Sequence, residues 1–270
     1  MAAFGKYEKI SGEIRKKIIK MNYLSQGTHI GSSLSIVDIL TLLYFKILKI
    51  NPKKPLQSNR DRFILSKGHA AAALYAALAQ RGFFSERILN TYCQNRGKLP
   101  GHATRGSVPG VEVSTGSLGH GLSMGVGMAL AGKNDKRRYR IFVLMSDGEC
   151  DEGSVWEAAL FAAHHKLDNL VAIIDYNKLQ AFGRTNEVLN LEPLKKKWES
   201  FGWRVKEING HNFFEIEKVL SRIPFAKNKP GIVIAHTVKG KGVSFMEDRL
   251  EWHYKNLMPA DYKMALEELA

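Results

Sequence analysis

Residues 145–183, MSDGECDEGSVWEAALFAAHHKLDNLVAIIDYNKLQAFG, contain the pattern that decides the fold. The apolar run 141–145 that leads into them is typical of a strand buried on both faces. Ser154 and Glu157 have the spacing of a capping box, which predicts that a helix begins there. One face of that helix is apolar, at Val155, Ala158, Ala159 and Ala162. A second buried-type strand follows at 170–174, so the order predicts a right-handed βαβ unit.

Two polar residues follow the two predicted strands, Asp147 after the first and Asn177 after the second. In open α/β sheets, ligands bind outside the carboxyl ends of the strands. A carboxylate, an amide oxygen and a nearby backbone carbonyl suit Mg²⁺ or Ca²⁺, and Mg²⁺ completes its shell with phosphates and water. Each residue also has an ordinary structural interpretation, because Asp caps turns and Asn adopts left-handed backbone conformations. Their spacing within one βαβ unit favours a shared site.

The rest of the chain continues the alternation of strands and helices. Further strand patterns lie at 62–65, 203–207 and 231–235. A buried helix is predicted at 35–48, after a polar loop at 28–33. The alternation predicts an α/β fold with a single doubly wound, mostly parallel sheet flanked by helices. Because we find no internal repeat or domain linker, residues 1–270 are expected to form one domain.

The composition is that of an ordinary globular protein with a basic surface. Hydrophobic residues make up 44% and charged residues 24% of the 270, and the formal net charge is +14. The basic residues occur in short groups such as 195–197 and do not alternate with aromatic residues, as they do in single-strand binding grooves. We therefore expect no nucleic-acid partner. The charge fits either a solvated surface or the attraction of phosphorylated, anionic substrates.

No segment predicts export or a membrane span. The N-terminal residues 1–20 lack the apolar core of a signal peptide. The most apolar long stretch, 36–50, is interrupted by Asp38 and Lys46. Two cysteines form neither a disulfide framework nor a zinc motif. These features predict a cytoplasmic protein without membrane contact.

The glycine-rich segments do not match nucleotide-binding motifs. Within 119–125 the last glycine comes one residue too late for the dinucleotide fingerprint, and 239–242 lacks the spacing of a phosphate-binding P-loop. Glycines 121, 125 and 127 lie in a predicted helix, where each costs about 1 kcal/mol relative to Ala. Such a cost is tolerable where the backbone approaches another element or a cofactor closely.

Histidines are concentrated in loops. Five of the nine lie in loops of small residues: His29, His69, His102, His120 and His253. A lone loop histidine is usually a surface or hydrogen-bonding residue, but several at one sheet edge would supply proton carriers that titrate near neutral pH. The other four are interpreted as structural: His164, His165, His211 and His236.

The stretch 145–183 resembles the thiamine-diphosphate motif, which begins with Gly-Asp-Gly and closes with Asn; Ser146 stands at the first glycine. Its residues at 147–149 and 175–177 are similar to those found in transketolases. The resemblance covers almost the whole chain, through the segments 29–31, 65–70, 99–102, 109–119, 237–242 and 252–253. Two residues depart from the family pattern, Ser117 in place of Pro and Tyr254 in place of Gly.

The resemblance implies a thiamine-diphosphate-binding fold, a cofactor site and a metal site. The metal, Mg²⁺ or alternatively Ca²⁺, is held by Asp147, Asn177 and the backbone carbonyl of Leu179. The cofactor is bound by His69, Gly116, Ser117, Leu118, Gly148, Glu149, Asn177 and His253. Catalytic roles fall to His29, His102 and His253, which surround the donor sugar, and to Glu152 beside the cofactor at a subunit interface.

The resemblance also implies a partner. Full-length transketolases contain a pyrimidine-binding domain that contributes the glutamate activating the cofactor, and we find no room for it after Ala235. We therefore expect the diphosphate-binding subunit of a two-chain transketolase, paired with a complementary C-terminal subunit in an α₂β₂ assembly. The complex would transfer a two-carbon ketol unit from a ketose phosphate to an aldose phosphate. The alternatives are a subunit of another thiamine-diphosphate-dependent synthase or lyase, and an inert assembly subunit.

Overall fold

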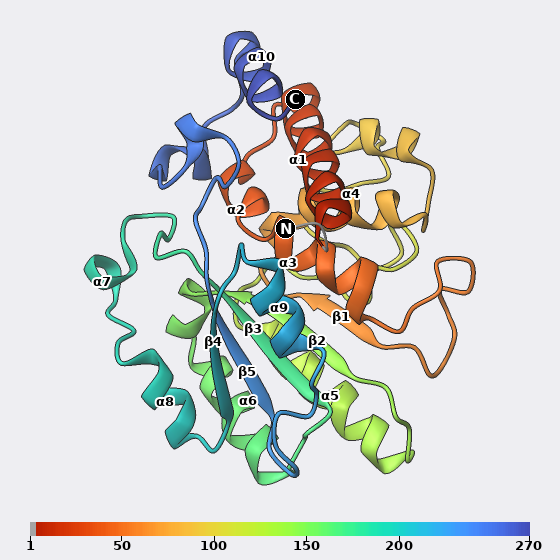
Figure 1. Cartoon of the computed structure of the whole chain (residues 1–270), viewed down its shortest axis with the longest axis vertical. Helices are drawn as coiled ribbons and strands as arrows, with labels where there is room; N and C mark the ends of the chain where they lie inside the picture. The colour runs from red at the N-terminus through yellow and green to blue at the C-terminus, as the bar shows by residue number, and fades with distance from the viewer. Residues whose placement is uncertain (1–3) are drawn as a thin grey trace.

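In the computed structural model, which describes residues 4–270, five parallel strands form the central sheet (Figure 1). Their order is β1-β2-β3-β5-β4, with β1 (Arg62–Leu65), β2 (Ile141–Ser146), β3 (Leu170–Tyr176), β4 (Arg204–Asn209) and β5 (Gly231–His236). The predicted α/β fold with one sheet flanked by helices is confirmed, and the sheet is parallel throughout. Residues 1–3 of the predicted domain lie outside the described residues.

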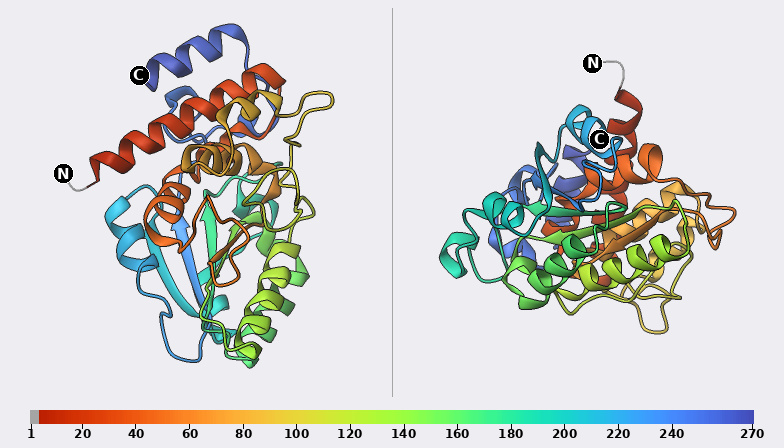
Figure 2. Two further views of the ribbon diagram at one scale, coloured as in Figure 1. Left: turned by 90° about the vertical axis from the view of Figure 1, so that its right-hand side faces the viewer. Right: turned by 90° about the horizontal axis from the view of Figure 1, so that it is seen from below.

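Helices cover both faces of this sheet, as the view from below shows (Figure 2). The connections that advance along the sheet place three helices on one face: α5 (His120–Asn134), α6 (Gly153–His164) and α8 (Leu194–Ser200). The connection from β4 to β5 steps back, so its helix lies on the opposite face, as expected for right-handed crossovers. The helices of that second face are α1 (Gly5–Ser25), α3 (Val37–Leu42), α4 (Ala71–Arg81) and α9 (Phe213–Leu220).

Shorter elements complete the chain. They are α2 (Ile30–Leu34), α7 (Thr185–Val188), α10 (Pro259–Glu268), a π-helical turn (Leu43–Ile47) and 3₁₀ turns at Gly68–Ala70, Glu86–Thr91, Gly148–Asp151, Ser244–Met246 and Leu250–His253. The last helix, α10, packs beside α1 (Figure 2), where the rings of Tyr23 and Tyr262 stack with centroids 4.1 Å apart. Among the described helices, none combines the length and apolar character needed to cross a membrane.

The apolar strands contribute side chains to two hydrophobic cores, one on each face of the sheet. In β2, Phe142 and Leu144 pack toward α1 and α4, whereas Ile141, Val143 and Met145 pack toward α5 and α6. This explains the unbroken apolar run in the sequence, because a strand covered on both faces has no solvent side. The register pairs Ser146 with Asp175 and Tyr176 with His236. The polar residues that follow β2, β3 and β5 therefore meet at one edge of the sheet.

Three local predictions are wrong. The predicted loop at 28–33 contains a buried helix, α2, and the predicted helix at 35–48 is divided between α3 and the π-helical turn. The small residues of α2 are required by packing, since a Cβ on Gly31 would lie 3.1 Å from Lys239 Cγ. Ser154 is not a helix cap: α6 begins at Gly153, and the Ser154 hydroxyl donates to the carbonyl of Gly119 at 3.0 Å.

The glycines of α5 divide into two kinds. A Cβ on Gly125 would lie 2.5 Å from Val143 Cγ2, and one on Gly121 would lie 2.2 Å from Ser66 Oγ. Gly127, two residues further along the same helix, has nothing within 4 Å of that position. Close approach to the sheet therefore explains Gly121 and Gly125, as their pattern in the sequence predicts, but not Gly127.

We expect Gly125→Ala to lower the free energy of unfolding by about 1–3 kcal/mol, because the added methyl overpacks the contact with Val143. Gly127→Ala is the matched control, and we expect it to raise that free energy by about 0.4–1 kcal/mol through the unfolded state. Urea unfolding of both variants measures the difference. Equal effects at the two positions would contradict this account of α5.

Candidate active site

A cavity of about 480 Å³ lies at the carboxyl edge of the sheet, beyond β2 and β3. It is lined by most of the site residues predicted from separate segments of the sequence: His29, His69, His102, Gly116, Leu118, Asp147, Gly148, Glu152, Asn177, Leu179 and His253. Its lining also includes Tyr254 and the strongly exposed Phe182. Two predicted cofactor-binding residues, Ser117 and Glu149, are not part of it.

Four of the five loop histidines form one cluster in this cavity. The ring of His29 lies at the centre, with centroid distances of 5.2 Å to His69, 5.9 Å to His102 and 4.9 Å to His253. The fifth, His120, is exposed and lies apart, with its Nδ1 3.0 Å from a backbone carbonyl. The prediction that several loop histidines share one sheet edge therefore holds for four.

Burial and neighbouring positive charge lower the pKa of three of these histidines, His29, His69 and His253, so that their rings are uncharged at neutral pH. Burial, followed by the charges of His102, Lys239 and Lys67, lowers the pKa of His29 to about 4. Burial and the charge of Lys239 lower the pKa of His253 to about 3, and burial lowers that of His69 well below its usual value. At neutral pH each of these rings can therefore donate a hydrogen bond from one nitrogen and accept at the other.

Asp147 is a buried carboxylate at the end of β2. It accepts hydrogen bonds from the backbone N–H groups of Gly148, at 2.8 Å, and Lys178, at 2.7 Å. Burial and the charge of Asp175 raise its pKa to about 6. Across residues 4–270, no Lys, Arg or His forms an ion pair with it. This carboxylate therefore lies next to the cavity with its charge uncompensated.

Asn177 and Leu179 add two more oxygens. The Asn177 Nδ2 group donates to Asp175 at 3.0 Å, which fixes the orientation of the amide, and Oδ1 accepts from the Leu179 N–H at 3.0 Å. The Leu179 carbonyl accepts from Lys239 Nζ at 3.1 Å. Because carbonyl oxygens have two lone pairs, both oxygens can accept one further partner.

The oxygens of Asp147, Asn177 and Leu179 suit a cation whose remaining ligands come from a bound phosphate and water. In the described part of the chain, no three His, Cys, Asp or Glu side chains gather as a metal centre. Asp147 with two neutral oxygens is the sparse protein contribution that Mg²⁺ accepts when phosphate and water complete its shell. The missing side chain of Gly148 avoids a crowded contact beside Asp147, since a Cβ there would lie 3.3 Å from the Gln180 side chain. The residues therefore suit a metal bound together with a phosphorylated ligand.

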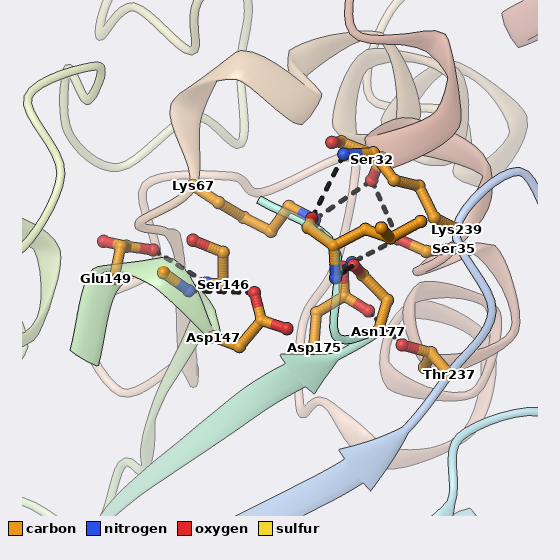
Figure 3. A network of polar contacts seen from close by, with 12 residues as sticks. Ser32, Ser35, Lys67, Ser146, Asp147, Glu149, Asp175, Asn177, Thr237 and Lys239 are labelled. Atoms are coloured by element: carbon orange, nitrogen blue, oxygen red, sulfur yellow. Dashed lines mark hydrogen bonds and ion pairs between the residues drawn. The ribbon is translucent and has the colours of Figure 1, made fainter. Parts of the chain in front are cut away.

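A buried ion pair supports this edge, and no pattern in the sequence indicated it. Lys67, at the end of β1, pairs with Asp175 in β3, and neither side chain is more than 1% exposed (Figure 3). Asp175 also accepts from Ser35 at 2.7 Å and from Thr237. Burial alone opposes ionisation, but Lys67 and these hydrogen bonds lower the pKa of Asp175. The pair therefore stays charged inside the protein.

Lys239 is a second buried cation that the sequence did not reveal, although 237–242 belongs to the segments that resemble the family. Its side chain is 1% exposed, and Nζ lies 3.1 Å from the Leu179 carbonyl, 3.2 Å from the Gln180 carbonyl and 3.0 Å from His253 Nδ1. Burial and the charge of Lys67 lower its pKa to about 8. Lys239 therefore lies behind the lining of the cavity, with its ammonium in contact with three groups that line it.

Glu149 holds a loop instead of facing the cavity. Its carboxylate is fully buried and accepts from Ser66 Oγ, from the Gly119 N–H at 3.0 Å and from the Ser146 N–H at 2.9 Å. Both carboxylate oxygens are therefore engaged with the protein, and the predicted contact between Glu149 and the cofactor stays a prediction. Ser117 borders a neighbouring hollow with His120.

The family model described as "Transketolase, thiamine diphosphate binding domain" matches residues 10–269. The chain belongs to this transketolase family. Two similar relatives are each 46% identical to it. One is named as a subunit of the apulose-4-phosphate transketolase of Phocaeicola vulgatus, and the other is "6-deoxy-6-sulfo-D-fructose transketolase subunit SqwG" of a Clostridium species. The first match covers 95% of this chain and 91% of the relative, and the second covers 89% and 88%.

Solved transketolases have the same fold as this chain. Transketolase from Leishmania mexicana superposes with a TM-score of 0.91 at 28% identity, and that from Campylobacter jejuni with 0.88 at 33%. Both matches cover 97% of this chain, but only 41% and 43% of those proteins. The chain therefore spans about two fifths of the length of these transketolases.

Breaking the buried pair should destabilise the protein strongly. We expect Lys67→Met to lower the free energy of unfolding by about 3–5 kcal/mol, because it leaves Asp175 charged and unpaired in the interior. The double variant Lys67→Met/Asp175→Asn should lose less than the sum of the two single variants. Urea unfolding of all four proteins measures the coupling. Additive losses would contradict a direct interaction.

The raised pKa of Asp147 predicts a pH dependence. A cation binds the carboxylate form, so protons compete for Asp147 below its pKa of about 6. We expect the apparent affinity for Mg²⁺, titrated in the presence of thiamine diphosphate, to fall below that pH by up to about tenfold per pH unit. Asp147→Asn is the control, because its weaker binding should lack this component of the pH profile. Parallel profiles for the two proteins would exclude Asp147 as the titrating group.

Proposed function

We propose that this chain is the diphosphate-binding subunit of a two-chain transketolase. The complex transfers a two-carbon ketol unit from a ketose phosphate to an aldose phosphate with thiamine diphosphate and Mg²⁺, for which Ca²⁺ is an alternative. The observation that carries the proposal is the cluster of His29, His69, His102 and His253, which shares one cavity with Asp147 and Asn177. The similarity of this chain to relatives that are named as transketolase subunits supports the two-chain form.

One group of residues would bind the metal and the cofactor, and the histidines would transfer protons. When bound, thiamine diphosphate supplies the electron sink for breaking and forming the carbon–carbon bond. Asp147, Asn177 and the Leu179 carbonyl would hold the metal. Lys239, which lies behind the cavity lining and has no carboxylate partner among the described residues, would give the diphosphate a positive environment. Gly116 and Leu118 also line the cavity, and we assign to them the contact with the rest of the cofactor.

Histidines handle the protons of the sugar. We assign this role to His29, His102 and His253, and place His69 at the diphosphate. Because the rings of His29 and His253 are uncharged at neutral pH, each can accept a proton from a hydroxyl and return it without first losing one. The positive charge of the nearby lysines disfavours an imidazolium, which makes the returned proton readily available.

The partner completes the site from the open side of the cavity. Glu152, half-exposed Tyr254 and exposed Phe182 belong to its lining, where a complementary pyrimidine-binding subunit would cover them. We propose an α₂β₂ heterotetramer, with 1–270 as its diphosphate-side domain, acting on pentose-phosphate-type sugars. The two free cysteines agree with a cytoplasmic location, which stays a prediction. No observation favours another thiamine-dependent reaction or an inert subunit.

Reconstitution tests the proposal. We expect the isolated chain to bind thiamine diphosphate weakly and to transfer no ketol unit, because half of the site belongs to the partner. Mixing it with the complementary subunit should give transfer from ketose phosphates but not from pyruvate. An Asp147→Asn chain, mixed in the same way, is the inactive control. Robust transfer by the isolated chain would refute the two-chain form, and a preference for pyruvate would refute the reaction.

A further inference from the structure

Outside the cavity, an imidazole that is only 13% exposed holds the segment that carries Lys239. The His211 ring lies in the turn between β4 and α9, and its Nε2 accepts a hydrogen bond from the Val238 N–H at 2.9 Å. Val238 precedes Lys239 directly, in the loop 237–242, which we call the Lys239 loop. The sequence pattern alone indicates only a structural role for His211.

The contacts of His211 define its tautomer. Its Nδ1 lies 2.8 Å from Asp38 Oδ2. Burial opposes ionisation of Asp38, but the hydrogen bond from His211 and the charge of Arg15 lower its pKa to about 2. A carboxylate can only accept, so Nδ1 carries the proton, and Nε2 is left with the lone pair that the Val238 N–H requires. Asp38 therefore makes His211 a hydrogen-bond acceptor at the Lys239 loop.

Arg15 fixes the other end of the same arrangement. Its Nη2 donates to Asp38 Oδ2 at 2.7 Å, and its Nε donates to the carbonyl of Lys241 at 3.0 Å. Side chains of α1, α3 and the turn before α9 thus hold the Lys239 loop on both sides of Lys239. The chain is close-packed here, since a Cβ on Gly242 would lie 2.8 Å from Arg15 Cδ.

We propose that Asp38 and His211 are positioning residues that hold the ammonium of Lys239 against the lining of the active site. The backbone of Val238 determines where the Lys239 side chain starts, and Nζ must reach two carbonyl oxygens and His253 within 3.2 Å. A shift of the Lys239 loop by about one ångström would break such contacts, because hydrogen bonds weaken steeply with distance and angle. The consequence for the cofactor rests on the proposed function, whereas the positioning itself does not.

Three variant chains test this positioning without any cofactor. His211→Leu removes both hydrogen bonds, and His211→Gln retains one donor and one acceptor in a side-chain amide. His236→Gln is the control, because His236 ends β5 close to the Lys239 loop but is a half-exposed residue paired with Glu207. Labelling with acetic anhydride, followed by peptide mass spectrometry, reports the accessibility of Lys239. We expect labelling at least tenfold faster in His211→Leu, and within threefold of the unchanged chain in the other two.

A second measurement follows thiamine diphosphate in the complex with the complementary subunit. His211→Leu should raise its Kd at least tenfold, with a much smaller change in the KM for the ketose donor, and His211→Gln should restore the Kd to within threefold. A merely structural role would affect the two constants alike. Lys239 labelling in His211→Leu that equals that of the unchanged chain would overturn the proposal.

Two controls keep the outcomes distinct. If His211→Leu does not fold, hydrogen exchange of the unchanged chain decides: the Val238 amide should be protected at least a hundredfold relative to an unstructured peptide, and an unprotected amide would overturn the inference. If the unchanged complex fails to bind thiamine diphosphate, the proposed function fails. The labelling of Lys239 then still tests the role of His211.

Discussion

Lys67 and Asp175 carry opposite charges in a part of the molecule from which water is excluded, so neither charge is tolerable without the other. Asp175 also accepts hydrogen bonds from Ser35 and Thr237, and it orients Asn177. Segments that follow three different strands, together with the turn between α2 and α3, therefore meet at one carboxylate. The edge of the sheet that lines the cavity depends on this meeting point.

The same charges determine the chemistry of the neighbouring groups. Positive charge from Lys67 and Lys239 adds to burial in lowering the pKa of His29 and His253, while the negative charge of Asp175 adds to burial in raising that of Asp147. The positive charge of Lys239 thus lies beside the uncharged imidazoles of His29 and His253, and the carboxylate of Asp147 has no ion-pair partner among residues 4–270. An anionic phosphorylated ligand would compensate the charge of Lys239, and a divalent cation would compensate that of Asp147.

The local sequence pattern was sufficient to predict the sheet and to place Asp147 and Asn177 at its edge, because each buried strand is adjacent in sequence to the polar residues that end it. The position of the histidines in loops indicated a group at one sheet edge, but only the family resemblance separated His120 from the four that form the cluster. Lys67 and Lys239 could not be distinguished among 40 Lys and Arg residues, because nothing in their neighbours marks burial. Helix α2 was missed because its small polar residues have low helix propensity and are held by tertiary packing.

The buried carboxylate of Glu149 has a consequence for ligand association. Its carboxylate accepts hydrogen bonds from Ser66, Gly119 and Ser146. These bonds connect the segment before α5 to the ends of β1 and β2 without the help of a ligand. A ligand that contacts Gly116 and Leu118 therefore meets backbone that is already ordered. Little conformational entropy remains to be lost on this side of the cavity, so preorganisation rather than induced folding governs recognition there.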